Sequence, residues 1–130
     1  MDDLYAGWDD DLGGDLAARL LAQIVEPLRN GAPVRYQRYD WHSLQFEEWV
    51  EVPVVDWLII EGVGAAQEVL RAIAEDSVFI DVEAELGKAR VIARDGAASL
   101  PHIDAWQRKE QAHFEREGTR ERVRQVVLEG

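Results

Sequence analysis

One short segment constrains the fold more than any other part of this chain. Residues 54–60 read Val-Val-Asp-Trp-Leu-Ile-Ile and are almost uniformly apolar. Such a run is typical of a β-strand buried on both faces, as in a parallel sheet that helices cover on both sides. Gly62 and Gly64 follow and end the predicted strand. The segment therefore favours an α/β fold.

The rest of the chain alternates between helical and strand-like patterns. Leucine and isoleucine recur every four residues from Leu12 to Leu28 and predict an amphipathic helix over 13–29. Pro27 should kink that helix or end its regular part early. Shorter helices are expected over 65–74, 85–94 and 103–117, and further strands over 33–41, 46–52, 78–82 and 124–128. We therefore expect one α/β domain over residues 1–130 with a mostly parallel sheet.

Composition excludes several classes of function. The chain has 26 acidic and 14 basic residues, and its formal net charge of −12 argues against binding to nucleic acid or to an anionic membrane. Cysteine is absent, which excludes disulfides, thiolate metal sites and cysteine nucleophiles. No apolar run approaches the roughly 20 residues of a membrane span, and Met1-Asp2-Asp3 is unlike the basic start of a signal peptide. These features predict a soluble, cytoplasmic protein.

Glu61 is the first candidate for chemistry. It stands at the end of the predicted strand 54–60, directly before Gly62. Open parallel sheets bind ligands at the carboxyl ends of their strands, where such an acid would act on Mg²⁺ directly or through water. The alternative is an ordinary solvent-exposed acid at the end of a strand.

Two further segments combine acids with aromatic rings. Asp2-Asp3-Leu4-Tyr5 offers a base, a metal ligand and a ring for a flat substrate, or else is part of a solvated acidic terminus. Tyr39-Asp40-Trp41 offers aromatic surface and a hydrogen-bonding acid, or else the packing of an edge strand.

Arg90 and Arg94 lie four residues apart and so share one face of a predicted helix. Their forked donors suit phosphate oxygens, although such a pair is also typical of a solvated helix face with nearby acids. The three histidines lack metal-ligand spacing and no Gly-x-Ser-x-Gly motif is present, which argues against a zinc site and a serine hydrolase.

In this order the segments resemble the P-loop nucleoside kinases of the uridine-kinase-like family, in particular its small actinobacterial members. Residues 2–5 are similar to the family's Asp-x-Phe-Tyr segment, and residues 39–41 to its Tyr-Asp-Phe substrate segment. Residues 58–62 resemble its Walker-B-like strand. Residues 79–95 resemble its strand and lid helix, with the pattern Ala-Arg-x-x-x-Arg-Asp retained. The resemblance covers nearly all 130 residues.

The resemblance implies a three-layer parallel sheet of the P-loop-kinase type, with a lid-like region at 84–101. It also implies an ATP-dependent phosphotransferase that acts on a nucleoside or a similar small alcohol, with Mg²⁺ and ATP bound. By similarity, Asp2 accepts the hydroxyl proton and helps hold Mg²⁺, and Asp3 is the alternative if the register differs by one. Tyr5, Tyr39 and Trp41 would contact the base or sugar, and Asp40 would bind the substrate. Glu61 would bind the metal. Arg90 and Arg94 would close over the phosphate.

The sequence departs from this family at two places. It contains no Gly-x-x-x-x-Gly-Lys-Ser/Thr motif, and its two lysines, Lys88 and Lys109, lie in other predicted helices. Gly87 and Val91 stand where the family's lid helices often carry arginine. We therefore expect a domain that lacks the first strand, the P-loop and the first helix, and that is inactive as written.

Three explanations stay open for that departure. The native protein carries an upstream P-loop, or the chain is a short non-catalytic relative that binds a ligand or a protein, or the resemblance arose by chance in an unrelated α/β domain. In the second case the strand at 54–60 lacks a neighbour, and an unpaired apolar edge seeks another chain. The polypeptide alone should then be poorly stable or form homo-oligomers.

Overall fold

The computed structural model describes residues 1–128, and the chain divides into two compact units. We call Met1–Asp76 the N-terminal unit and Ser77–Gly130 the C-terminal unit. Each unit combines helices with one two-stranded sheet, so the expected mixture of helix and strand is confirmed. The expectation of one domain over the whole chain stays a prediction.

The N-terminal unit is built on one long helix, which matches the prediction over 13–29. It consists of α1 (Gly14–Leu20), a π-helical turn η2 (Leu21–Val25) and α2 (Glu26–Arg29). Its apolar stripe is buried at Leu16, Leu20, Ile24 and Val25. The regular helix stops at Leu20, shortly before Pro27. A proline lacks an N–H and clashes with the carbonyl four residues earlier, and the wider π turn relieves both problems.

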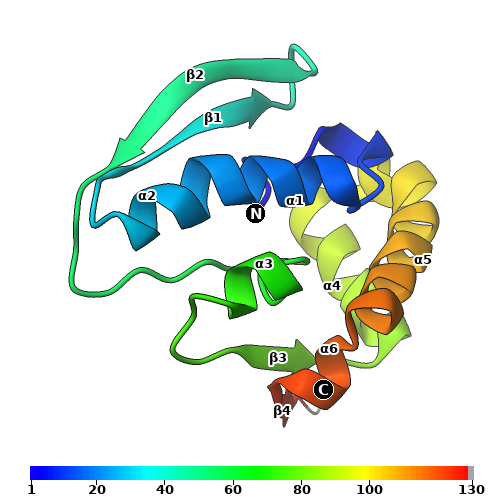
Figure 1. Ribbon diagram of the computed structural model, residues 1–130. Coiled ribbons are helices and arrows are strands. Elements are labelled where there is room, and N and C mark those ends of the chain that lie inside the picture. Colours follow the sequence, from blue (N-terminus) through cyan, green and yellow to red (C-terminus); the bar gives the residue numbers. More distant parts are fainter. Residues whose placement is uncertain (129–130) are drawn as a thin grey trace. The chain divides into compact units, whose positions relative to one another are not determined.

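Two antiparallel strands lie along this helix (Figure 1). They are β1 (Val34–Asp40) and β2 (Gln45–Val52), paired from Val34 with Val52 to Asp40 with Gln45, with a bulge between Gln37 and Tyr39. Both strands were predicted from the sequence, over 33–41 and 46–52. Their hairpin is antiparallel, so it does not supply the parallel sheet that we expected from the sequence.

The strand predicted at 54–60 is wrong. These residues form no regular structure and are exposed, Trp57 to 82% and Ile59 to 85%. A strand must pair its backbone groups with a neighbour, and within residues 1–76 the only other strands pair with each other. The hydrophobicity of residues 54–60 therefore predicted a buried strand, but no strand of this unit pairs with them. After this segment, only α3 (Glu68–Arg71) forms within the helix predicted at 65–74, and its Leu70 is buried.

The C-terminal unit is a strand–helix–strand arrangement. β3 (Val78–Asp81) is followed by α4 (Ala84–Asp95), a short turn η3 (Ala97–Ser99), α5 (Leu100–Glu117) and α6 (Thr119–Arg122). The last element described is β4 (Arg124–Val127), which pairs with β3 in parallel. These elements confirm the strands and helices predicted for this part of the sequence. No helix among residues 1–128 is long and apolar enough to cross a membrane.

Local contacts set the limits of the helices in this unit. The Glu83 carboxylate caps α4 by accepting hydrogen bonds from the backbone N–H groups of Glu85 and Leu86, at 3.2 and 3.0 Å. Gly118 ends α5 in the left-handed conformation, at φ 58°. Phe79 of β3 packs edge to face on Phe114 of α5, with ring centroids 4.9 Å apart. That aromatic pair joins the sheet to the helix.

Candidate functional site

Three segments that the sequence analysis singled out come together in the N-terminal unit. The amino group of Met1 donates to the carbonyl of Glu61 at 2.7 Å, and the Tyr5 hydroxyl donates to the carbonyl of Val63 at 2.5 Å. The backbone N–H of Tyr39 donates to the carbonyl of Asp3 at 2.8 Å. The indole N–H of Trp41 donates to the carbonyl of Asp2 at 3.1 Å. Residues 2–5 therefore lie between residues 39–41 and residues 61–63.

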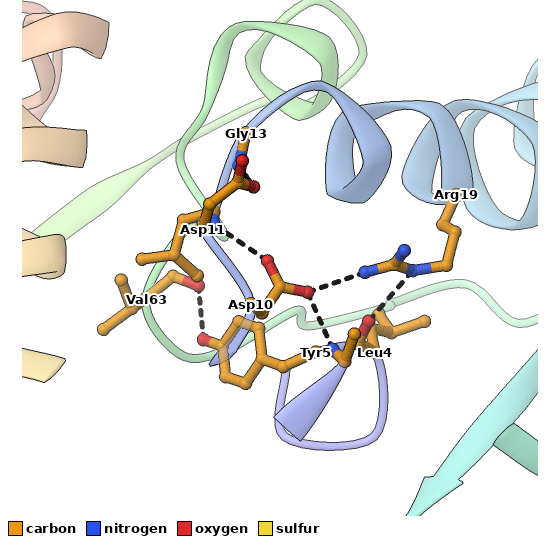
Figure 2. A network of polar contacts seen from close by, with 9 residues as sticks. Leu4, Tyr5, Asp10, Asp11, Gly13, Arg19 and Val63 are labelled. Carbon is orange, nitrogen blue, oxygen red and sulfur yellow. Dashed lines mark hydrogen bonds and ion pairs between the residues drawn. The ribbon is translucent and has the colours of Figure 1, made fainter. Parts of the chain in front are cut away.

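A buried carboxylate fixes the loop that carries the first of these segments (Figure 2). Asp10 is 6% exposed and accepts hydrogen bonds from the backbone N–H groups of Ala6 and Leu12, at 2.7 and 2.8 Å. It also forms an ion pair with Arg19 of α1 at 2.7 Å, and Arg19 donates to the carbonyl of Leu4 at 3.2 Å. Leu12 adopts a left-handed backbone at φ 56°, which the bond to Asp10 stabilises. Asp10 is therefore part of the packed structure and is not a solvent-exposed acid of the N-terminal region.

Two glycines allow close approach within this site. A Cβ on Gly62, at φ 118°, would lie 2.8 Å from the Cβ of Met1. A Cβ on Gly7, at φ 74°, would lie 2.6 Å from the Tyr39 hydroxyl. Only glycine combines this backbone with so little space. The glycine after Glu61 therefore admits the chain's own first residues.

The structure separates the roles of the two adjacent aspartates. Asp3 accepts a hydrogen bond from the Tyr36 hydroxyl at 2.9 Å and lies 3.4 Å from Nε of Arg38. Burial, followed by the hydrogen bond to Asp3, raises the pKa of Tyr36. The Asp2 side chain is exposed and makes no hydrogen bond or ion pair among residues 1–128. The carboxylate of Asp2 is thus the one available to a ligand.

Tyr36 and Arg38 were not among the site residues predicted from the sequence. Their alternation on one face of β1 was visible in the sequence, but the carboxylate that they meet comes from residues more than thirty positions away. Arg38 also pairs with Glu48 of β2 at 2.7 Å. It therefore ties the hairpin to Asp3.

The predicted substrate-binding residues fall into two groups. Tyr5 and Tyr39 are only 3% and 7% exposed and belong to the core. Asp40 accepts hydrogen bonds from the backbone N–H groups of His42 and Ser43 at 2.7 and 2.9 Å, so it stabilises the turn between β1 and β2. Those bonds, that from Ser43 first, lower the pKa of the Asp40 carboxyl. Of these four residues, Trp41 has the accessible aromatic ring.

Trp8 is an aromatic neighbour that the sequence analysis missed. Its ring packs edge to face on that of Trp41, with centroids 5.6 Å apart. Trp41 in turn packs on Tyr39 at 5.3 Å, and Tyr39 on Phe46 at 5.2 Å. The only sequence signal for Trp8 is its place three residues after Tyr5 in the acidic opening.

The metal predicted at Asp2 and Glu61 has two accessible carboxylates. Both side chains are exposed, and the hydrogen bond between Met1 and the Glu61 carbonyl brings their backbones close. Among residues 1–128, no group of three histidine, aspartate or glutamate side chains could hold a metal ion. Mg²⁺ commonly binds through one or two carboxylates, with waters and substrate phosphates as the other ligands. Both carboxylates are of the kind that Mg²⁺ binds, and a metal at Asp2 and Glu61 stays a prediction.

The basic residues predicted to contact phosphate lie in the C-terminal unit. Arg94 makes two hydrogen bonds to Asp95, both 2.7 Å long, and these bonds lower the pKa of Asp95. Arg90 is exposed and makes no such contact among residues 1–128. Of the predicted arginine pair, Arg94 is therefore already engaged.

Neither lysine is part of a phosphate cradle. Lys88 donates to the carboxylate of Asp104 at 2.5 Å, and Lys109 lies over the ring of Trp106, 5.9 Å from its centroid. The sequence also has no P-loop motif to supply backbone N–H groups. The residues present therefore do not fit the phosphates of ATP.

Comparison of the chain with protein-family models, with curated proteins and with solved structures finds no match.

Proposed function

We propose that this chain is the acceptor-binding part of a uridine-kinase-like, ATP-dependent phosphotransferase of the three-layer P-loop-kinase type. The acceptor would be a nucleoside or a similar small alcohol. The observation that supports this proposal is the meeting of residues 1–5, 39–41 and 61–63 through four hydrogen bonds. The resemblance implies one site for residues 2–5, residues 39–41 and Glu61.

Asp2 is the residue to which we assign the central role. Its exposed carboxylate would accept the proton of the acceptor hydroxyl, and together with Glu61 it would hold Mg²⁺. The ion would neutralise phosphate charge when bound. Asp3, tied to Tyr36 and Arg38, would keep the backbone of Asp2 in place. Since the residues present do not fit ATP, we adopt the first of the three explanations above, in which an upstream P-loop binds the phosphate donor.

A second candidate is a non-catalytic ligand-binding or protein-interaction remnant of the same fold. The exposed segment 54–60 favours it, because no hydrogen bond joins these residues to any other among residues 1–128. Val55 and Leu58 of that segment also line an apolar pocket of about 160 Å³, together with Leu28, Val34 and Val52. Unpaired apolar backbone of this kind binds another strand. The partner would be a second copy of the chain or another protein.

Calorimetric titration with uridine, with and without Mg²⁺, tests the first candidate on the 130-residue chain. We expect uridine to bind, more tightly with Mg²⁺, and Asp2→Asn to abolish the effect of Mg²⁺. The matched control is Asp15→Asn, which removes another exposed aspartate of the same unit and should behave as the wild type. Absence of uridine binding, with a molar mass that rises with protein concentration in sedimentation experiments, would favour the second candidate instead.

A further inference from the structure

The two tryptophans beside Asp2 are the accessible aromatic rings of this site. Trp8 and Trp41 are partly exposed, whereas Tyr5 and Tyr39 are buried. The indole N–H of Trp41 donates to the carbonyl of Asp2 at 3.1 Å, which fixes its ring next to the backbone of Asp2. Trp8 packs edge to face on Trp41, with ring centroids 5.6 Å apart. A ligand that reaches the carboxylate of Asp2 therefore has indole surface nearby.

The loop that carries Trp8 is held on both sides. Trp8 belongs to the short turn η1 (Gly7–Asp9), whose Gly7 is buried close to the Tyr39 hydroxyl. The next residue, Asp10, bonds to the backbone of Ala6 and Leu12 and to Arg19. A ring on a fixed loop loses little conformational entropy when a ligand stacks on it. This is the property of a preorganised contact surface.

The charge of the N-terminal unit favours an uncharged ligand. Residues 1–76 contain 16 acidic and 5 basic residues, a formal net charge of −11. Arg19 and Arg38, the arginines that contact residues 3–10, are paired with Asp10 and with Asp3 and Glu48. A phosphorylated ligand would meet repulsion at residues 3–10, because the two guanidiniums that contact them are already paired with carboxylates.

We propose that Trp8 and Trp41, and not Tyr5 and Tyr39, form the surface on which a neutral, flat heterocyclic ring of the acceptor stacks. This inference rests on the proposed function and adds to it a ring-contacting residue, Trp8, and a preference for the unphosphorylated acceptor.

Affinities of the full 130-residue chain for uridine and for uridine 5′-monophosphate test this inference. Loss of a stacking ring weakens binding about tenfold, so Trp8→Leu and Trp41→Leu should each bind uridine about tenfold more weakly. Trp8→Phe keeps an aromatic face and should retain most of the affinity. Trp57→Leu, which removes an 82% exposed tryptophan of the same unit, is the matched control and should not change it. The monophosphate should bind more weakly than uridine. Added salt should reduce this difference in affinity, because it screens the repulsion between the phosphate and the acidic unit.

The possible results separate this inference from the proposed function. If the wild-type chain does not bind uridine, the proposed function fails, and the inference with it. If it binds uridine and Trp8→Leu equals the control, the inference is overturned while the proposed function stands. An NMR measurement on the wild type covers the case in which Trp8→Leu does not fold. The indole N–H signal of Trp8, assigned from its loss in Trp8→Phe, must shift when uridine is added, and an unchanged signal overturns the inference.

Discussion

The two units of this chain bury apolar side chains to different extents. Ten of the eleven buried apolar side chains in the described structure lie in the N-terminal unit, and Ile103 is the only one in the C-terminal unit. The N-terminal unit carries a formal charge of −11, whereas residues 77–130, with 10 acids and 9 bases, carry −1. The unit with the stronger charge repulsion thus also has the larger apolar core.

The strands of the C-terminal unit leave apolar side chains exposed. Ile80 of β3 is 62% exposed and Val127 of β4 is 68% exposed. Parallel strands are normally covered on both faces, and an isolated pair of strands is marginally stable. The buried apolar side chains of the N-terminal unit come from its long helix, its hairpin, α3 and the loop before the helix, whereas the 18-residue α5 contributes only Ile103. The difference teaches that a core of this size needs several elements packed around one helix. We therefore expect the stability of the chain to reside mainly in the N-terminal unit.

Core truncation should give the largest contrast between the units. Leu16→Ala removes a fully buried side chain of α1 and should lower the free energy of unfolding by about 2–5 kcal/mol. Ile80→Ala removes a mostly exposed side chain of β3 and should lower it by less than about 1 kcal/mol. Urea denaturation measures both values. Equal losses would show that the C-terminal unit has a core of comparable strength.

Removal of one ion pair in each unit should give a smaller contrast. Asp10→Ala leaves the backbone N–H groups of Ala6 and Leu12 and the partly buried Arg19 without their partner, at a cost of about 2–3 kcal/mol. Asp104→Ala breaks the exposed pair with Lys88 and should leave the melting temperature nearly unchanged. Calorimetry measures the melting temperature and the loss of stability of each variant. A larger loss for Asp104→Ala would contradict our account of where the structure is held together.

The smallest expected effect is the pH-dependent contribution of Glu110 to stability. Burial raises the pKa of Glu110 in α5, so the folded chain binds this proton more tightly than the unfolded chain. Stability contributed by protonated Glu110 is then present at acidic pH and is lost as pH rises through its folded pKa. Glu110→Gln should therefore slightly raise the melting temperature at pH 7 but not at pH 3.

The exposed Glu121→Gln is the control for that effect. It should leave the melting temperature unchanged at both pH values. A gain for Glu110→Gln that is equally large at pH 3 would show that the burial of its charge is not the cause.

Local periodicity predicted the elements whose partners lie nearby in the sequence. The four-residue repeat from Leu12 to Leu28 predicted the long helix, and alternation predicted β1. The pattern at 54–60 failed, because a buried strand depends on a neighbour that periodicity does not reveal. The same distinction applies to the site. The segments that meet were predicted together, but the contacts of Asp3 with Tyr36 and Arg38, and of Trp8 with Trp41, depend on tertiary packing.

The most direct test of the central claim is an NMR titration of the ¹⁵N-labelled chain with uridine and Mg²⁺. Our account predicts that the amide and indole signals that shift belong to the N-terminal unit, around Asp2, Trp8, Trp41 and Glu61, and that the amide signals of Val34 and Val52, at the hairpin's far end, do not move. Signals that remain unchanged throughout, or shifts confined to residues 77–128, would contradict it.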